Sequence, residues 1–342
     1  MMQNPLIFQF HDIAQAIITS ESPLVRGFFL AEYGYHQIEQ SAVHLPKVSL
    51  DFHLQNSSPQ NFTRHTHKLL ARWSYKASLK PAEIQLDVCG NKAAISMVHH
   101  MLLHPSLRWL SASTGTLLLH AGAVAKNNRS LIFTGKGGAG KTTTTSLILA
   151  SERGWKIHAD DYVFLNEEQS KAYVTRSHLY RDLQNWVPGI SARLTPWERT
   201  RLEFFGILRK YSREGIKWPV RLSPERLWPG VQIAETAIPA GILLLERADI
   251  PKPALHEVKN FEETAQELVQ MNFGEARHFL APLRKAGRLD ENWLNSWKDK
   301  EYELINHLIH SHPTFRLVLP FSQSAGIAKS SLLPVLEELV TP

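Results

Sequence analysis

Alternating apolar and polar residues predict strands in the first third of the chain. Residues 84–88 (Ile-Gln-Leu-Asp-Val) alternate cleanly, as in a strand with one buried face. A turn over residues 89–92 suggests that residues 93–97 return as a partner strand. Residues 98–110 are apolar without a period of two, which favours a helix. We therefore predict that residues 1–110 form a small β-rich α+β domain.

After residue 110, short apolar strands alternate with helical segments, a pattern that predicts an α/β core. Glycines and prolines separate many of these segments, as expected at turns. We therefore predict an α/β domain over residues 111–342 that ends in helices. The predicted strands are residues 117–124, 131–133, 156–159, 162–165, 241–245 and 315–319, and the predicted helices are residues 143–150, 261–272, 290–310 and 325–340.

Composition places the chain among folded globular proteins. Of its 342 residues, 43% are hydrophobic and 20% are charged, which provides enough apolar material for a sizeable core. No apolar run approaches the roughly 18 residues that span a bilayer, and the first residues lack the basic start of a signal peptide. Cys89 is the one cysteine, which excludes an internal disulfide. We therefore expect a cytoplasmic protein with no membrane partner.

Residues 135–142 (Gly-Lys-Gly-Gly-Ala-Gly-Lys-Thr) fit the pattern G-x-x-x-x-G-K-[ST] between a predicted strand and a predicted helix. Glycines let successive N–H groups point at phosphate oxygens, and the start of a helix adds positive potential there. Lys141 would bind the β- and γ-phosphates, and Thr142 would bind Mg²⁺, so we predict ATP and Mg²⁺ as ligands. The candidate nucleotide-binding residues are Gly135, Lys136, Gly137, Gly138, Ala139, Gly140, Lys141, Thr142 and Thr143.

Two adjacent carboxylates, Asp160 and Asp161, follow a short predicted strand, 19 residues after Lys141. The carboxyl ends of neighbouring strands in an α/β sheet share one crevice, so these acids are expected near the loop. One carboxylate would hold Mg²⁺, and the other would take a proton from an attacking hydroxyl. Without a cation the two would repel each other, which itself indicates a metal nearby. Both acids fit either role, and we take Thr142 and Asp160 as the candidate metal ligands.

Three segments at these spacings resemble the HPr kinase/phosphorylase-related P-loop kinases: residues 119–124 (Leu-His-Ala-Gly-Ala-Val), the glycine-rich loop and residues 159–161 (Ala-Asp-Asp). The core of that family is similar to that of phosphoenolpyruvate carboxykinases, and the resemblance is strongest over residues 115–165. It implies a nucleotide domain of that fold and a kinase that transfers the γ-phosphoryl group of ATP to a hydroxyl. The acceptor would be serine or threonine of a peptide or protein. The resemblance also implies that His120 lies near the transferred phosphate.

The chain departs from the bacterial HPr kinases at two places. Thr143 stands where they carry an acidic residue, and their later glutamate- and glycine-rich sequence does not follow Asp161. The resemblance therefore selects neither HPr as the acceptor nor a reverse phosphorylase activity. Arg176 and Arg181 are candidate partners of the γ-phosphate or of the acceptor.

The same loop also matches the deviant form found in arsenite-pump and partition ATPases. In those proteins a lysine at the position of Lys136 crosses the interface of a dimer, so this alternative implies a homo-oligomer. Their loop usually lies near the N-terminus, whereas more than 130 residues precede it here. The sequence after Asp161 also lacks their later aspartate-proline motifs. We keep this ATPase as the second hypothesis.

A third hypothesis is a nucleotide-regulated module that binds nucleic acid. Residues 191–230 hold nine basic and four acidic side chains and so carry most of the net charge of +6. Such a patch attracts phosphate, acidic peptide or nucleic acid, and Trp197, Trp218 and Trp228 could stack on single-stranded bases. The sequence contains no nucleic-acid-binding motif beside these tryptophans, so nucleic acid is the less favoured partner.

Two groups of histidines have spacings that occur in metal sites. His100 and His104 are four residues apart, and His307, His310 and His312 lie close together near the end of a predicted helix. Neither group has an obvious further ligand at metal spacing, so we predict that neither binds a metal.

Overall fold

The computed structural model describes residues 4–341 except 56, 58, 68–69, 188, 213–217 and 322–324, and the side chains of 325–329 are not described. The chain forms two compact units. The first comprises Met1–Leu118 and Gln266–Ile305, and the second comprises Leu119–Ala265 and Asn306–Pro342. These units differ from the contiguous domains 1–110 and 111–342 predicted from the sequence, because a later segment belongs to the first unit.

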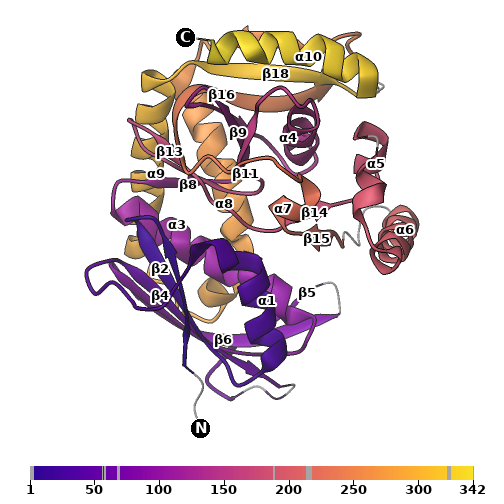
Figure 1. Cartoon of the computed structure of the whole chain (residues 1–342). Helices are drawn as coiled ribbons and strands as arrows, with labels where there is room; N and C mark the ends of the chain where they lie inside the picture. The colour runs from indigo at the N-terminus through magenta and orange to yellow at the C-terminus, as the bar shows by residue number, and fades with distance from the viewer. Residues whose placement is uncertain are drawn as a thin grey trace. The chain divides into compact units, whose positions relative to one another are not determined.

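In the described part of the first unit, a mixed sheet of seven strands has the order β3-β1-β2-β4-β7-β6-β5. Figure 1 labels β2, β4, β5 and β6 of this sheet. β2, β4 and β7 run parallel, and the other neighbours are antiparallel. The predicted strand over 84–88 is confirmed. The strands are β1 (Leu6–Phe10), β2 (Ala14–Thr19), β3 (Gln37–Ile38), β4 (Lys47–Leu54), β5 (Thr63–His67), β6 (Ala71–Lys80) and β7 (Glu83–Gly90).

Residues 93–97, predicted as a return strand, instead enter the helix α2 (Ala94–Val98). Both edges of β7 are occupied, by β4 and by β6, so a return strand would have nowhere to pair. The side-chain oxygen of Asn91 accepts a hydrogen bond from the N–H of Ala94 at 3.0 Å, which favours the start of a helix. The predicted helix over 98–110 is confirmed. The helices of this region are α1 (Pro23–Tyr33), the π-turn η2 (His99–Leu103) and α3 (His104–Ser113).

A buried ion pair holds the later helices α8 (Phe261–Lys285) and α9 (Glu291–Ser311) to α3 within the first unit. Arg108 of α3 donates to both carboxylate oxygens of Glu301 at 2.7 and 2.6 Å, and to the carbonyl of Asn272 at 2.6 Å. The two charged side chains are at most 1% exposed. Contacts between such distant residues leave no local pattern in the sequence. The sequence therefore predicted the helices correctly but assigned them to the wrong unit.

The second unit is built on a mixed sheet of nine strands, counted over the described residues, with the order β11-β9-β10-β16-β13-β12-β8. β17 and β18 continue it beside β16, which is parallel to both β10 and β18. The chain is thus a mixed α/β protein. The strands are β8 (Leu117–Leu119), β9 (Ala121–Lys126), β10 (Arg129–Thr134), β11 (Lys156–Ala159), β12 (Val163–Leu165), β13 (Ser170–Lys171), β16 (Thr236–Ala248), β17 (Ala254–Glu257) and β18 (Thr314–Pro320), with β14 (Ser177–Leu179) and β15 (Val220–Leu222) forming a separate pair.

The core of the second unit lies between its parallel strands and two helices, α4 (Lys141–Leu149) and α10 (Ala325–Val340) (Figure 1). Phe133 of β10, Leu243 of β16 and Leu317 of β18 are fully buried. Ile148 of α4 and Leu336 of α10 belong to the same hydrophobic cluster. Burial of these side chains fixes α4, and with it the loop that precedes α4, against the sheet.

The single strand predicted over residues 117–124 is wrong in one respect. It is broken at His120 into β8 and β9, which pair with different neighbours. β8 lies beside β12, whereas β9 lies between β10 and β11. The break matters for the site. His120 belongs to neither strand and immediately precedes β9.

The three C-terminal helices predicted from the sequence are confirmed as α8, α9 and α10, and α8 continues well beyond its predicted end. The remaining helices of the second unit are α5 (Leu183–Trp186), α6 (Pro196–Tyr211) and α7 (Pro224–Leu227). Among the described residues, none of the helices combines the length and the apolar composition needed to cross a membrane.

The substitution Glu301→Gln should lower the free energy of unfolding by about 3–5 kcal/mol, because it leaves the charge of Arg108 buried without its partner. Urea denaturation followed by circular dichroism measures the change. The matched control is Glu291→Gln, which breaks the exposed ion pair with Arg284 (side chains 55% and 57% exposed) and should change the stability far less, because water screens this pair. Equal effects of the two substitutions would contradict a stabilising role for the buried pair.

Candidate functional site

The three sequence segments that carry the predicted chemistry meet at one edge of the second sheet. β9 runs antiparallel to both β10 and β11, so the carboxyl ends of β10 and β11 flank the beginning of β9. The glycine-rich loop leaves β10, the acids leave β11, and His120 precedes β9. Two hydrogen bonds connect them: the N–H of Ala121 donates to the carbonyl of Asp161 at 3.1 Å, and the Thr134 hydroxyl donates to the carbonyl of His120 at 3.2 Å.

The glycine-rich loop has a conformation that requires glycine at defined positions. Gly135, Gly138 and Gly140 have φ angles of +147°, +89° and +114°, in the region that side chains disfavour. A Cβ atom on Gly135 would lie 2.8 Å from the carbonyl oxygen of Leu245. The ammonium of Lys141, at the start of α4, folds back and donates to the carbonyl of Gly135 at 2.7 Å. The loop is therefore curled around the side chain that the sequence predicts to bind phosphate.

Arg247 of β16 is a cation at this loop that the sequence analysis missed. Its Nε donates to the carbonyl of Ala139 at 3.1 Å, and its Nη1 donates to the carbonyl of Pro320 at 2.7 Å. A Cβ atom on Gly140 would lie 2.7 Å from Nη2 of Arg247. Burial lowers the pKa of this guanidinium. The sequence did offer one indication of its role. Arg247 lies two residues after the apolar run 241–245, and this run ends at the same edge of the sheet as β10.

Asp160 lies against the loop, with its carboxylate aimed at the beginning of α4. The N–H of His178 donates to its Oδ2 atom at 3.1 Å. Loss of water and the charge of Asp161 raise the pKa of Asp160 to about 7, while hydrogen bonds from His178, Ser177 and Thr142 oppose this shift. The hydrogen bond from Thr142 joins the two residues that the sequence analysis named as metal ligands. A hydroxyl and a carboxylate are oxygen donors of the kind that Mg²⁺ prefers, so the two residues fit this ion.

Asp161 is paired with the histidine that precedes β9. Nε2 of His120 lies 3.2 Å from Oδ1 of Asp161, and the two side chains are 18% and 21% exposed. The imidazole ring of His120 stacks on Tyr162 with a centroid distance of 5.2 Å. Burial raises the pKa of Tyr180 to about 12, and the charge of Asp161 adds to the shift. The two predicted acids thus have different surroundings: Asp160 faces the loop, and Asp161 faces His120 and Tyr180.

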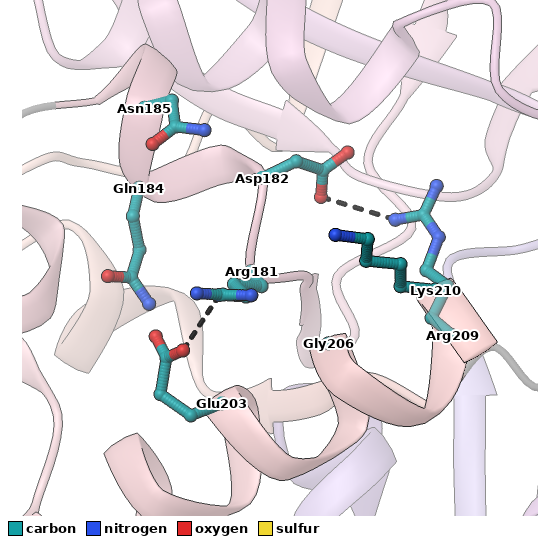
Figure 2. Close-up of a pocket in the computed structure, with 8 residues that line it drawn as sticks. All are labelled: Arg181, Asp182, Gln184, Asn185, Glu203, Gly206, Arg209 and Lys210. Atoms are coloured by element: carbon teal, nitrogen blue, oxygen red, sulfur yellow. Dashed lines mark hydrogen bonds and ion pairs between the residues drawn. The ribbon is translucent and has the colours of Figure 1, made fainter.

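A cleft of about 630 Å³ lies next to Tyr180, between α6 and the segment around α5. Figure 2 shows its ion pairs: Arg181 reaches Glu203 at 2.7 Å, and Arg209 reaches Asp182 at 3.3 Å. The guanidinium of Arg209 also lies over the ring of Tyr180, 5.4 Å from its centroid. Tyr180 therefore contacts Arg209, which lines the cleft, and the charge of Asp161 raises the pKa of its hydroxyl.

The remaining candidates from the sequence are spread over the second unit. Arg181 lines the cleft, whereas Arg176 is partly buried in the segment before β14. Of the three tryptophans in the basic segment, Trp228 is 3% exposed, Trp218 stacks on Phe205, and Trp197 is 68% exposed. These three rings do not form a common surface on which bases could stack.

A comparison of the chain with protein-family models and with curated protein sequences finds no match. An assignment of function therefore depends on the chemistry of the site. The loop, His120 and the two aspartates come from one local stretch and were predictable from sequence. Arg247, Tyr180 and the cleft come from distant segments.

The substitution Gly135→Ala should destabilise the ligand-free protein by roughly 1–3 kcal/mol, because it forces a side chain into a strained backbone region and against Leu245. Thermal and urea denaturation measure the effect. Gly137→Ala is the matched control in the same loop, since an added Cβ there meets no atom within 4 Å. Equal stabilities of the two variants would contradict the loop conformation described above.

The raised pKa of Asp160 predicts a pH dependence of stability. Between its ordinary value of 3.8 and about pH 7, the folded ligand-free protein keeps a proton that the unfolded chain releases. The free energy of unfolding should therefore fall as pH rises through this window, by about 1.4 kcal/mol per pH unit at most. Asp160→Asn removes this group, so the variant should gain stability relative to the wild type as pH rises.

Urea denaturation between pH 4 and pH 8 measures the difference. Asp182→Asn, at a carboxylate whose side chain is 59% exposed, is the control and should follow the wild-type curve. Parallel curves for Asp160→Asn and the wild type would show that Asp160 does not titrate in this window.

Proposed function

We propose that the protein is an ATP- and Mg²⁺-dependent kinase with a P-loop nucleotide domain similar to that of the HPr kinase/phosphorylase-related enzymes. It transfers the γ-phosphoryl group to a hydroxyl, such as serine or threonine of a peptide or protein. One observation carries the proposal. The glycine-rich loop, a histidine and two differently placed carboxylates share one sheet edge, with Thr142 hydrogen-bonded to Asp160.

The loop and the start of α4 provide the phosphate site. Backbone N–H groups of the curled loop and the helix N-terminus attract the phosphate oxygens. The Lys141 ammonium donates to the carbonyl of Gly135 at 2.7 Å, a contact that phosphate oxygens can replace. Arg247 adds a second positive charge beside Ala139. These groups support binding of a nucleoside triphosphate rather than of an uncharged ligand.

Thr142 and Asp160 would hold Mg²⁺. A carboxylic acid with a pKa near 7 is partly protonated at neutral pH, and a neighbouring cation favours its ionised form. When bound, Mg²⁺ would neutralise charge on the β- and γ-phosphate oxygens. The carboxylate of Asp160 already accepts hydrogen bonds from His178, Ser177 and Thr142. It is therefore poorly placed to take a proton from the hydroxyl of the phosphate acceptor.

Asp161 is the better candidate for the general base. It would take the proton of the attacking hydroxyl as the acceptor oxygen forms its bond to the γ-phosphorus. The bond from that phosphorus to the oxygen bridging to the β-phosphate breaks, and ADP leaves with the electron pair. His120 orients Asp161 through the 3.2 Å contact and is itself held by Tyr162. Positioning and charge neutralisation supply most of the rate enhancement in this kind of transfer.

The cleft beside Tyr180 is the proposed acceptor site. Its walls carry Arg181, Arg209 and Lys210 against Asp182 and Glu203 (Figure 2). Charged groups of both signs match a polar peptide with backbone and side-chain groups to pair. A small apolar substrate would leave these groups without partners when it excluded water.

The kinase is tested with ATP labelled on its γ-phosphate and a cell extract as the source of acceptors. The wild type should transfer label to a peptide or protein band. Asp161→Asn should lower transfer by about 10²–10⁴-fold while the affinity for a fluorescent ATP analogue changes little. Lys141→Ala should weaken binding of the analogue itself. Glu291→Gln, at an exposed ion pair of α9, serves as a folded control outside the nucleotide site and the proposed acceptor site.

Retention of full transfer after replacement of both aspartates would rule out the kinase. Lys136→Ala distinguishes the deviant ATPase, because Lys136 is exposed and is expected to be dispensable in the kinase. Release of free phosphate that is lost in Lys136→Ala and depends on dimer formation would instead support the arsenite-pump type.

A further inference from the structure

Three histidines of the first unit converge on one point, and none of them belongs to a motif found in the sequence. His65 and His67 lie on β5, and because they are two residues apart they share one face of the strand. His278 of α8 faces them. Its ring centroid is 5.4 Å from that of His65 and 5.1 Å from that of His67. One ring nitrogen of each residue lies within 4.8 Å of the other two.

Packing holds the two elements together on either side of this cluster. Tyr75 of β6 donates from its hydroxyl to the carbonyl of Phe279, the residue after His278, at 2.7 Å. Arg288, just beyond α8, donates to the hydroxyl of Thr63 at the start of β5 at 3.3 Å. The residue opposite His67 on β6 is Ala71, whose small side chain occupies little of the space around the imidazoles. These contacts hold β5 and α8 together without involving the imidazoles, and His65 also packs against Trp73, the residue opposite it on β6, with a centroid distance of 4.5 Å.

The surroundings favour neutral imidazoles, the form that binds metals. Burial lowers the pKa of His65 and of His278, and Arg277 and His65 lower that of His278 further, against an opposing effect of Glu275. Nε2 of His65 is buried and has no hydrogen-bond partner among the described residues. The exposed Arg277 donates to Nε2 of His278 at 3.3 Å, which also marks that nitrogen as an acceptor.

We propose that His65, His67 and His278 form a binding site for a divalent transition-metal ion, with Zn²⁺ as the reference ion. Three imidazole nitrogens suit Zn²⁺, Ni²⁺ or Cu²⁺, whereas Mg²⁺ prefers oxygen ligands. With metal–nitrogen distances of about 2.1 Å, tetrahedral ligand atoms are roughly 3.4 Å apart, so nitrogens that lie within 4.8 Å of one another must approach by at most about 1.4 Å. Small side-chain rotations at these half-buried residues achieve this.

The fourth position of a tetrahedral ion would be open to water or to an exogenous ligand. Cys89 is not the missing ligand. Cys89 of β7 lies opposite Ser74 of β6, and Ser74 lies opposite Arg64 of β5. Residues opposite each other share a face, and Arg64 is next to His65 in the strand, so Cys89 and His65 are on opposite faces of the sheet. Three protein ligands with an open position are typical of metal sites that bind or transform a small molecule.

A second group of histidines must be distinguished from this site by experiment. His99, His100 and His104 also place ring nitrogens within 4.8 Å of one another. However, His99 and His104 are each 1% exposed, and His99 packs against Phe28, Phe29 and Tyr33. An ion entering there would lose its hydration among aromatic rings, which makes this group the weaker candidate.

Isothermal titration of the full chain, free of affinity tags and treated with a chelator, with Zn²⁺ tests the proposal. One ion per chain should bind, and Co²⁺ at the same site should give the visible absorption of a four-coordinate ion. His278→Gln and His67→Gln should each weaken Zn²⁺ binding at least ten- to hundredfold. His307→Gln replaces an exposed histidine (67% exposed) and should bind like the wild type. Binding should also weaken as pH falls and protons compete for the imidazoles.

Three outcomes would overturn the site: no Zn²⁺ binding by the wild type, unchanged binding by both His278→Gln and His67→Gln, or loss of binding in His100→Gln instead. Thermal denaturation of each metal-free variant establishes that it is folded, and two variants on separate elements guard against the failure of one. The result is independent of kinase activity, since the readout is binding of the ion.

Discussion

The position of β9 between β10 and β11 is the constraint on which the candidate site depends. Because β9 is antiparallel to both, its first residue lies where the other two strands end. The pairs Thr134↔Ala121 and Ala159↔Ala123 fix this register. A shift by one residue would turn each side chain to the other face and separate His120 from Asp161. The ladder therefore determines how the candidate residues are placed, although its hydrogen bonds involve only the backbone.

Small residues in β9 make this arrangement sterically possible. A Cβ atom on Gly122 would lie 2.9 Å from the Thr145 methyl group and 3.3 Å from the carbonyl oxygen of Asp160. The absence of a side chain at this position lets α4 lie against the sheet, and the loop before α4 follows. Gly122, in the Ala-Gly-Ala run after His120, is thus a packing requirement of the site. In the sequence it was visible only through a family resemblance, because small residues give no periodic signal.

The local parts of the structure could be predicted from sequence, and the distant contacts could not. The glycine-rich loop, β10, β11 and the last three helices follow from apolar runs and turn residues that act within a few positions. Residues 93–97 have a strand-like composition, but both edges of β7 are filled, and a helix results. Likewise, nothing near Glu301 in the sequence points to Arg108, and nothing near His278 points to β5. Each of these contacts is decided by packing between segments that lie far apart in the chain.

The two proposed ion sites use opposite ligand chemistry, and this follows from how each is built. Thr142 and Asp160 offer oxygen atoms, and burial together with the charge of Asp161 raises the pKa of Asp160, so a bound cation would favour its ionised form. The three histidines offer imidazole nitrogens, and burial lowers the pKa of two of them, His65 and His278. A hard ion such as Mg²⁺ gains little from imidazole, so the histidines would not compete for the ion that accompanies ATP. Ligand type alone therefore separates the two proposed sites: the oxygen ligands favour Mg²⁺, and the imidazole nitrogens favour Zn²⁺.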